Sequence, residues 1–193
     1  MTNALKAYID RATCDLRDVP GAGATTSAML RVLIGVCVLT LSAKVQIPFY
    51  PVPMTMQTLA IVLIGGLYGW RLGLVTVGSY LAVGAAGLPV FAGPVGGIAY
   101  MAGPTGGFLA GFLLAVAATG YLTQNGRCSS IPRLALAMTA GHVLIFAAGL
   151  GYLSLLVSIP AAWAAGAAPF LLGTAVKTAI AVLFMYALRT RTR

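Results

Sequence analysis

Long apolar stretches, separated by short breaks, follow one another along the chain from residue 30 to residue 188. A bilayer core of about 30 Å is crossed by roughly 20 apolar helical residues, so each stretch of this length predicts a membrane-spanning helix. Arg71 and its glycine neighbours alone separate the second stretch from the third, so five spans with one long kinked helix is the alternative. The six predicted spans are Leu30–Ile47, Thr55–Trp70, Leu72–Leu88, Thr105–Thr123, Leu134–Ile159 and Pro169–Leu188.

Positive residues distinguish the two alternatives, because Lys and Arg accumulate on the cytoplasmic side of a membrane protein. The connections 48–54, 89–103 and 160–168 contain no charged residue. Six spans with both termini in the cytoplasm fit this alternation, whereas five spans would strand Arg71 in the membrane or place the C-terminal arginines outside. Basic residues occupy the other boundaries: Arg31 with the N-terminal segment, Arg71, Arg127 with Arg133, and Arg189 with Arg191 and Arg193.

The composition excludes a soluble domain. Hydrophobic residues make up 60% of the chain and charged residues only 8%, against roughly a quarter charged in soluble proteins. The excess of 12 Lys and Arg over 3 Asp and Glu therefore indicates membrane topology rather than nucleic-acid binding. Asp10, Asp15 and Asp18 are the three acids, so the predicted spans lack a carboxylate for proton coupling or acid–base catalysis.

The N-terminal segment and the cysteines add little chemistry. Cys14, Cys37 and Cys128 are odd in number and lack metal-ligand spacing, so we interpret them as reduced thiols and expect neither a metal nor a cofactor. No apolar core of about 7–15 residues precedes Met29, which argues against a cleaved signal peptide. We expect a cytoplasmic segment over residues 1–28 and one transmembrane domain over residues 29–193.

Two lysines remain after the topological charges are assigned. Lys44 lies near the outer end of the first span, and Lys177 lies midway along the sixth. A lysine at helix depth costs a few kcal/mol unless it snorkels, pairs or faces a wet cavity. Snorkelling explains Lys44, with an anionic ligand as the alternative. Lys177 requires either a backbone carbonyl or an anionic ligand, because no acid is available in the membrane.

The first outer connection contains Pro48, Pro51 and Pro53, which exclude helix and make the segment extended. It leads to Thr55 and Gln57 at the mouth of the second span. We expect Thr55 to cap that helix or to bind a ligand, and Gln57 to bind a ligand or a neighbouring helix.

The second outer connection, residues 84–107, is apolar and rich in Gly and Pro. Such backbone is costly against lipid, so it should pack in protein or line a cavity, as a re-entrant lid would. No Gly-Lys-Ser/Thr motif of an ATP-binding loop occurs in the chain. We interpret His142, the single histidine, as a neutral residue hydrogen-bonded to a neighbouring helix.

Four segments carry a family resemblance. They are Pro51-Val-Pro-Met-Thr-Met-Gln-Thr58, Tyr80-Leu-Ala-Val-Gly-Ala-Ala-Gly-Leu-Pro-Val-Phe-Ala-Gly93, Gly103-Pro-Thr-Gly-Gly-Phe108 and Gly173-Thr-Ala-Val-Lys177. From about Leu33 to Met185 the chain resembles BioY, the biotin-specific S component of energy-coupling factor (ECF) transporters.

The resemblance implies an all-α membrane protein of six transmembrane helices with apolar Pro/Gly-rich outer loops, which captures biotin from outside. It also implies a transmembrane T component and ABC-type ATPases as partners that supply the energy. In the family, the last helix typically offers an acidic residue three positions before a lysine, both near the biotin head group. Lys177 matches that lysine, but Thr174 stands at the acidic position.

The chemistry of biotin agrees with these residues. Its carboxylate requires a cation, its ureido ring requires hydrogen-bonding groups, and its fused rings require apolar and aromatic walls. The expected substrate-binding residues are Lys177, Thr174, Gln57, Thr55, Ser79, Tyr80, Phe91 and Lys44.

Two other function classes remain open. A self-sufficient transporter or facilitator for biotin or another small anionic vitamin, working as a homo-oligomer, would need no energising partner. A membrane enzyme has almost no candidates for acid–base catalysis. We therefore expect a multi-pass transport subunit of the cell membrane rather than an enzyme.

Overall fold

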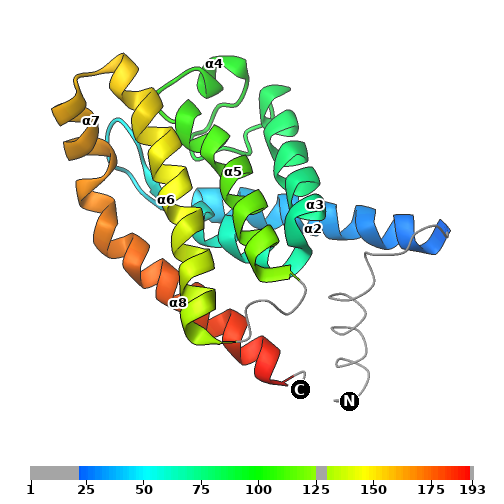
Figure 1. Cartoon of the computed structure of the whole chain (residues 1–193). Coiled ribbons are helices and arrows are strands. Elements are labelled where there is room, and N and C mark those ends of the chain that lie inside the picture. Colours follow the sequence, from blue (N-terminus) through cyan, green and yellow to red (C-terminus); the bar gives the residue numbers. More distant parts are fainter. Residues whose placement is uncertain (1–21, 125–129, 192–193) are drawn as a thin grey trace.

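The computed structural model describes residues 22–124 and 130–191, and helices dominate it (Figure 1). A helix satisfies its backbone groups within one segment, which a bilayer requires. The elements in chain order are α2 (Ala22–Lys44), β1 (Gln46–Ile47), β2 (Met54–Thr55), α3 (Gln57–Ala85), α4 (Ile98–Met101), α5 (Gly106–Thr123), α6 (Ile131–Leu156), α7 (Ile159–Gly166), the 3₁₀ helix η2 (Ala168–Phe170) and α8 (Leu171–Arg191).

Helix α3 folds back on itself at Gly69, whose φ of 74° and ψ of 175° interrupt the helix. The side-chain amide of Gln57 lies 2.7 Å from the Tyr80 hydroxyl, although 23 positions separate the two residues. Along a straight helix they would be about 34 Å apart. Five described helices are long and apolar enough to cross a membrane, and α3 supplies two arms. The six predicted spans are thus confirmed, and the five-span alternative is wrong.

Several bounds differ from the predicted ones. Helix α2 ends at Lys44 rather than at Ile47, because β1 pairs with β2 in antiparallel register, with Gln46 opposite Thr55. The prolines between the two strands prevent a helix in this connection. The backbone N–H and C=O groups of β1 and β2 therefore pair with each other. Thr55 therefore lies in a strand and does not begin the second span, which starts at Gln57.

The other two outer connections pack against the protein. The second contains buried Val90, Phe91 and Ala92, as expected for apolar backbone at this position. The third is largely helical, with Pro160 in the first turn of α7, where proline is favoured. Helices α4 and α7 lie at the same end of the molecule, at the top of Figure 1.

The predicted N-terminal segment lies mostly outside the described residues, as do Cys14 and Cys128. The described chain begins in α2 at Ala22, seven residues before the expected domain start at Met29. The division into residues 1–28 and 29–193 stays a prediction.

Helix α5 packs between α3 and α6 at glycine contacts. A Cβ atom on Gly111 would lie 2.9 Å from the Ile145 Cα atom of α6, and one on Gly120 would lie 2.6 Å from the Gly69 carbonyl carbon of α3. Small residues let the backbones of membrane helices approach this closely. The same helices shape the cavity described below.

Replacing Gly69 should destabilise the fold through the backbone alone. A side chain there meets open space, but the φ and ψ of Gly69 are nearly restricted to glycine. We expect Gly69→Ala to lower the free energy of unfolding by about 1–3 kcal/mol. Gly78→Ala is the matched control, because Gly78 also faces open space but has helical geometry. Thermal unfolding in detergent measures both, and equal melting temperatures would contradict the strained hinge.

Candidate ligand-binding pocket

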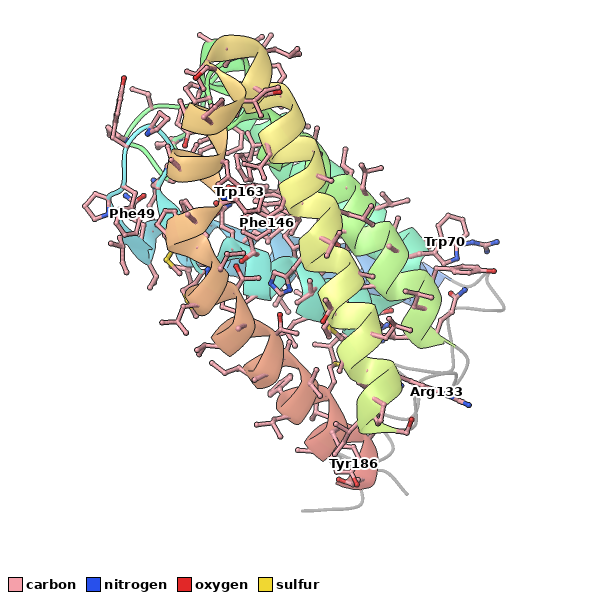
Figure 2. All side chains as sticks on the ribbon, turned by 60° about the vertical axis from the view of Figure 1, so that its left-hand side comes forward. Phe49, Trp70, Arg133, Phe146, Trp163 and Tyr186 are labelled. Atoms are coloured by element: carbon pink, nitrogen blue, oxygen red, sulfur yellow. The ribbon has the colours of Figure 1, made fainter. Side chains whose placement is uncertain are left out.

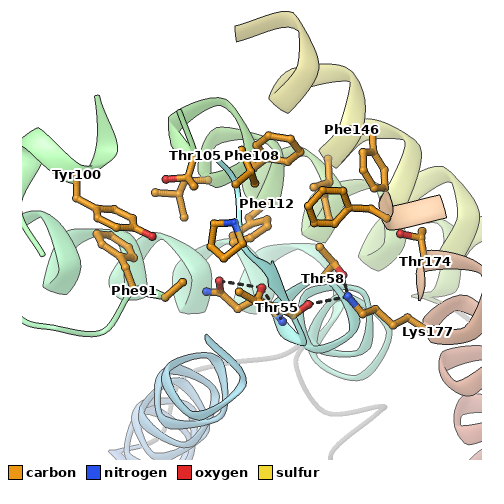
Figure 3. A pocket seen from close by; sticks show the side chains of 17 residues that line it. Thr55, Thr58, Phe91, Tyr100, Thr105, Phe108, Phe112, Phe146, Thr174 and Lys177 are labelled. Atoms are coloured by element: carbon orange, nitrogen blue, oxygen red, sulfur yellow. Dashed lines mark hydrogen bonds between the residues drawn. The ribbon is translucent and has the colours of Figure 1, made fainter. Parts of the chain in front are cut away.

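A small pocket lies near the end of the molecule formed by α4 and α7, among elements distant in sequence (Figure 3). Its cavity measures about 60 Å³. Six aromatic rings form a large part of the wall, and threonines, one amide and one ammonium provide the polar lining. The aromatic residues are Phe91, Tyr100, Phe108, Phe112, Phe146 and Phe170, and the polar ones are Thr55, Gln57, Thr58, Thr105, Thr174 and Lys177.

Lys177 brings a positive charge into the pocket. Its side chain is 6% exposed, and its ammonium donates to the Thr55 carbonyl at 2.6 Å and to the Thr58 hydroxyl at 3.4 Å. Both acceptors are neutral, and no Asp or Glu follows Asp18 in the sequence. The backbone carbonyl expected for Lys177 is thus present, while the charge stays uncompensated. An anionic group in the pocket would supply that compensation.

A hydrogen bond to Tyr80 fixes the orientation of the Gln57 side chain. The Gln57 amide donates to the Tyr80 hydroxyl at 2.7 Å, and its side-chain oxygen lies 3.2 Å from the Thr55 hydroxyl, which donates to it. Tyr80 in turn donates to the Val90 carbonyl at 3.0 Å. Gln57 thus binds the neighbouring arm of α3 and also lines the pocket. Tyr80 was expected to bind substrate, but it does not line the pocket. It forms hydrogen bonds with the lining residue Gln57 and with the Val90 carbonyl, which precedes the lining residue Phe91.

Two groups of rings form the aromatic wall. At one side Phe91 stacks on Tyr100 with centroids 5.0 Å apart, and Tyr80 meets Phe91 edge to face at 5.5 Å. At the other side Phe146 packs edge to face against Phe108 at 6.3 Å and Phe170 at 6.4 Å. Figure 2 shows Phe146 pointing into the interior, whereas Trp70 and Arg133 point outward. Flat apolar walls of this kind suit a ring-shaped ligand.

Three of the eight expected binding residues, Lys44, Ser79 and Tyr80, do not line the pocket. The Lys44 ammonium donates to the carbonyls of Phe91 at 2.8 Å and Gly93 at 2.9 Å. It therefore contacts the loop that carries Phe91. Thr55, Gln57, Phe91, Thr174 and Lys177 do lie together around the cavity.

Sequence reasoning missed much of the wall. Thr58, Thr105, Phe108, Phe112, Phe146 and Phe170 line the pocket but were not expected there. Phe108 and Phe112 are four residues apart and therefore share one helix face. That spacing was a usable signal, but nothing in the sequence specifies which neighbour the face meets.

His142 lies apart from this pocket, in a groove between α6 and α8. Its Nδ1 is 3.0 Å from the Met138 carbonyl and 3.1 Å from the Thr178 hydroxyl of α8. A carbonyl only accepts, so Nδ1 carries a proton. This arrangement agrees with the expected contact between His142 and a neighbouring helix.

The fold and the pocket define a largely helical membrane protein with an aromatic and polar pocket near one end of the bundle. A family model of the BioY family matches residues 13–193. The chain belongs to the BioY family.

Curated relatives agree with this assignment. The biotin transporter BioY of Rhizobium etli is 33% identical over 75% of this chain and 82% of its own. The probable biotin transporter BioY of Pyrococcus horikoshii is 34% identical over 83% of this chain and 95% of its own. The BioY of Thermotoga maritima is 32% identical over the same shares.

A solved structure shares the fold. The S component for biotin from an ECF-type ABC transporter superposes with a TM-score of 0.74 at 24% identity, covering 89% of this chain and 95% of that one. The fold expected from the sequence is therefore confirmed.

Proposed function

We propose that this protein binds biotin in the aromatic pocket and serves as the substrate-binding subunit of a transporter in the cell membrane. The single observation that carries the proposal is a buried lysine, Lys177, without an acidic partner in a cavity lined by aromatic rings and neutral polar groups. The family supports the choice of ligand, because the relatives are named as biotin transporters.

The polar lining can satisfy the parts of biotin. Gln57 offers amide groups to a ureido ring, and the threonine hydroxyls either donate or accept. Thr174, one turn before Lys177, is uncharged, so its contact with the ligand lacks charge assistance. We infer that affinity here depends more strongly on Lys177 and on the rings.

We expect the wall of the pocket to move when biotin binds. The elements around it include loops as well as helices, and loops move more readily than packed helices. Binding therefore includes an opening and closing step.

Lys177→Ala should weaken biotin binding by about tenfold or more, because it removes the buried charge that faces the cavity. Binding of labelled biotin to purified protein measures the change. Val176→Ala is the matched control on the same helix, since Val176 is 52% exposed and does not line the pocket. Equal affinity in Lys177→Ala and the unchanged protein, with both folded, would make Lys177 a structural residue.

We propose that transport depends on a membrane-embedded T component and ABC-type ATPases. The chain has no Gly-Lys-Ser/Thr nucleotide motif and no carboxylate in its spans for proton coupling. Cells without these partners should therefore show binding but no uptake of labelled biotin when they produce this chain alone. A matched strain that supplies the partners is the control. Uptake by the chain alone would favour the self-sufficient transporter.

We propose that the pocket end faces outward and both termini lie in the cytoplasm. The outer connections are uncharged, while Arg189 reaches the Thr123 carbonyl at the C-terminal end of α5, opposite the pocket. A cysteine at exposed Pro94 should react with an impermeant reagent in intact cells, and one at exposed Thr190 should react only after the cells are opened. Both variants are made in a background in which Cys14, Cys37 and Cys128 are replaced by alanine, so that only the introduced cysteine reacts. The reverse pattern would overturn this orientation.

A further inference from the structure

Four consecutive residues of the second outer loop, Val90–Gly93, are held by side chains of other elements. We call these residues the strap. All four strap carbonyls accept hydrogen bonds from side chains. Val90 accepts from Tyr80 at 3.0 Å, Phe91 and Gly93 accept from Lys44 at 2.8 and 2.9 Å, and Ala92 accepts from Gln46 at 3.0 Å.

The strap closes one side of the pocket. Phe91 is 1% exposed, and its ring lines the cavity while stacked on Tyr100. Phe91 and Ala92 of the strap belong to the wall beside the ligand space, so the position of the strap affects how biotin enters and leaves. The carbonyls of the strap depend on separate side chains rather than on a helical ladder. Its displacement would take the Phe91 ring out of the wall.

Lys44 supplies two of the four strap bonds and is the charged donor among them. Bonds from an ammonium are roughly twice as strong as neutral ones. Lys44 itself is exposed and does not line the pocket, and it ends helix α2, next to the strand that carries Gln46. It therefore links α2 to the wall of the site without reaching the ligand space.

We propose that Lys44 is a positioning residue whose bonds to the Phe91 and Gly93 carbonyls hold the strap closed and thereby set the rates of ligand entry and exit. This inference rests on the proposed biotin site. It assigns the two leftover lysines different roles: Lys177 faces the ligand, and Lys44 fastens the wall.

Lys44→Met removes the donors and keeps the apolar stem. We expect biotin to associate and dissociate about tenfold faster, with a smaller change in the equilibrium constant. Backbone amides of residues 88–97 should exchange hydrogen faster even without biotin. Gln46→Leu should act in the same direction but less, because it removes one neutral bond. Ser42→Ala is the matched control, since its hydroxyl bonds to Leu39 within α2.

Biotin methyl ester separates this role from direct binding of the carboxylate. If Lys44 positions the strap, Lys44→Met accelerates exchange of the ester and of biotin alike. If Lys44 contacted the carboxylate, the variant would weaken biotin alone and would not speed association, which would overturn the proposal. Unchanged amide exchange and dissociation would overturn it too. Should the unchanged protein bind no biotin, the proposed function fails, and faster amide exchange in Lys44→Met would still support the strap contact.

Discussion

The buried ammonium of Lys177 imposes the main constraint on the ligand end of this molecule. In a chain without an acid after Asp18, its hydrogen bonds go to the Thr55 carbonyl and the Thr58 hydroxyl. Neutral oxygens offset only part of the cost of burying a charge. These bonds connect helix α8 to β2 and to the start of α3. All three elements contribute residues to the lining of the pocket. The same incomplete compensation is the basis of the proposed preference of the pocket for an anionic ligand.

Carbonyl acceptors have a second role at this end of the protein. Irregular backbone within an apolar environment must find partners, and here it finds them in side chains of neighbouring elements. Carbonyls of the strap accept hydrogen bonds from Tyr80, Lys44 and Gln46. The Ala102 carbonyl, which follows α4, accepts one from Tyr152. Loops held in this way have a fixed conformation, and breaking a few hydrogen bonds releases them. The opening and closing step proposed for the pocket needs this combination.

The sequence predicted the spans and part of the site for identifiable reasons. Apolar length and alternating loop charge determine how often the chain crosses the bilayer, so the six spans followed directly. Lys177 was predicted because a lysine at mid-span is costly and stands out in an apolar stretch. Phe146 and Phe170 were not predicted, because phenylalanine in a span is ordinary and its direction depends on helix packing. Lys44 was placed among the ligand residues because charge alone does not specify which acceptor lies within reach.

By itself, then, the sequence determined the class of protein, the number of spans and the presence of an uncompensated cation, because each depends on composition and order along the chain. Only the tertiary structure decided that Gly69 folds α3 into two arms, that Gln57 meets Tyr80 across them, and that the two lysines point to different acceptors. Such choices depend on contacts between residues far apart in the chain. Helix packing at glycine contacts sets those contacts, and a linear pattern of hydrophobic residues does not encode them.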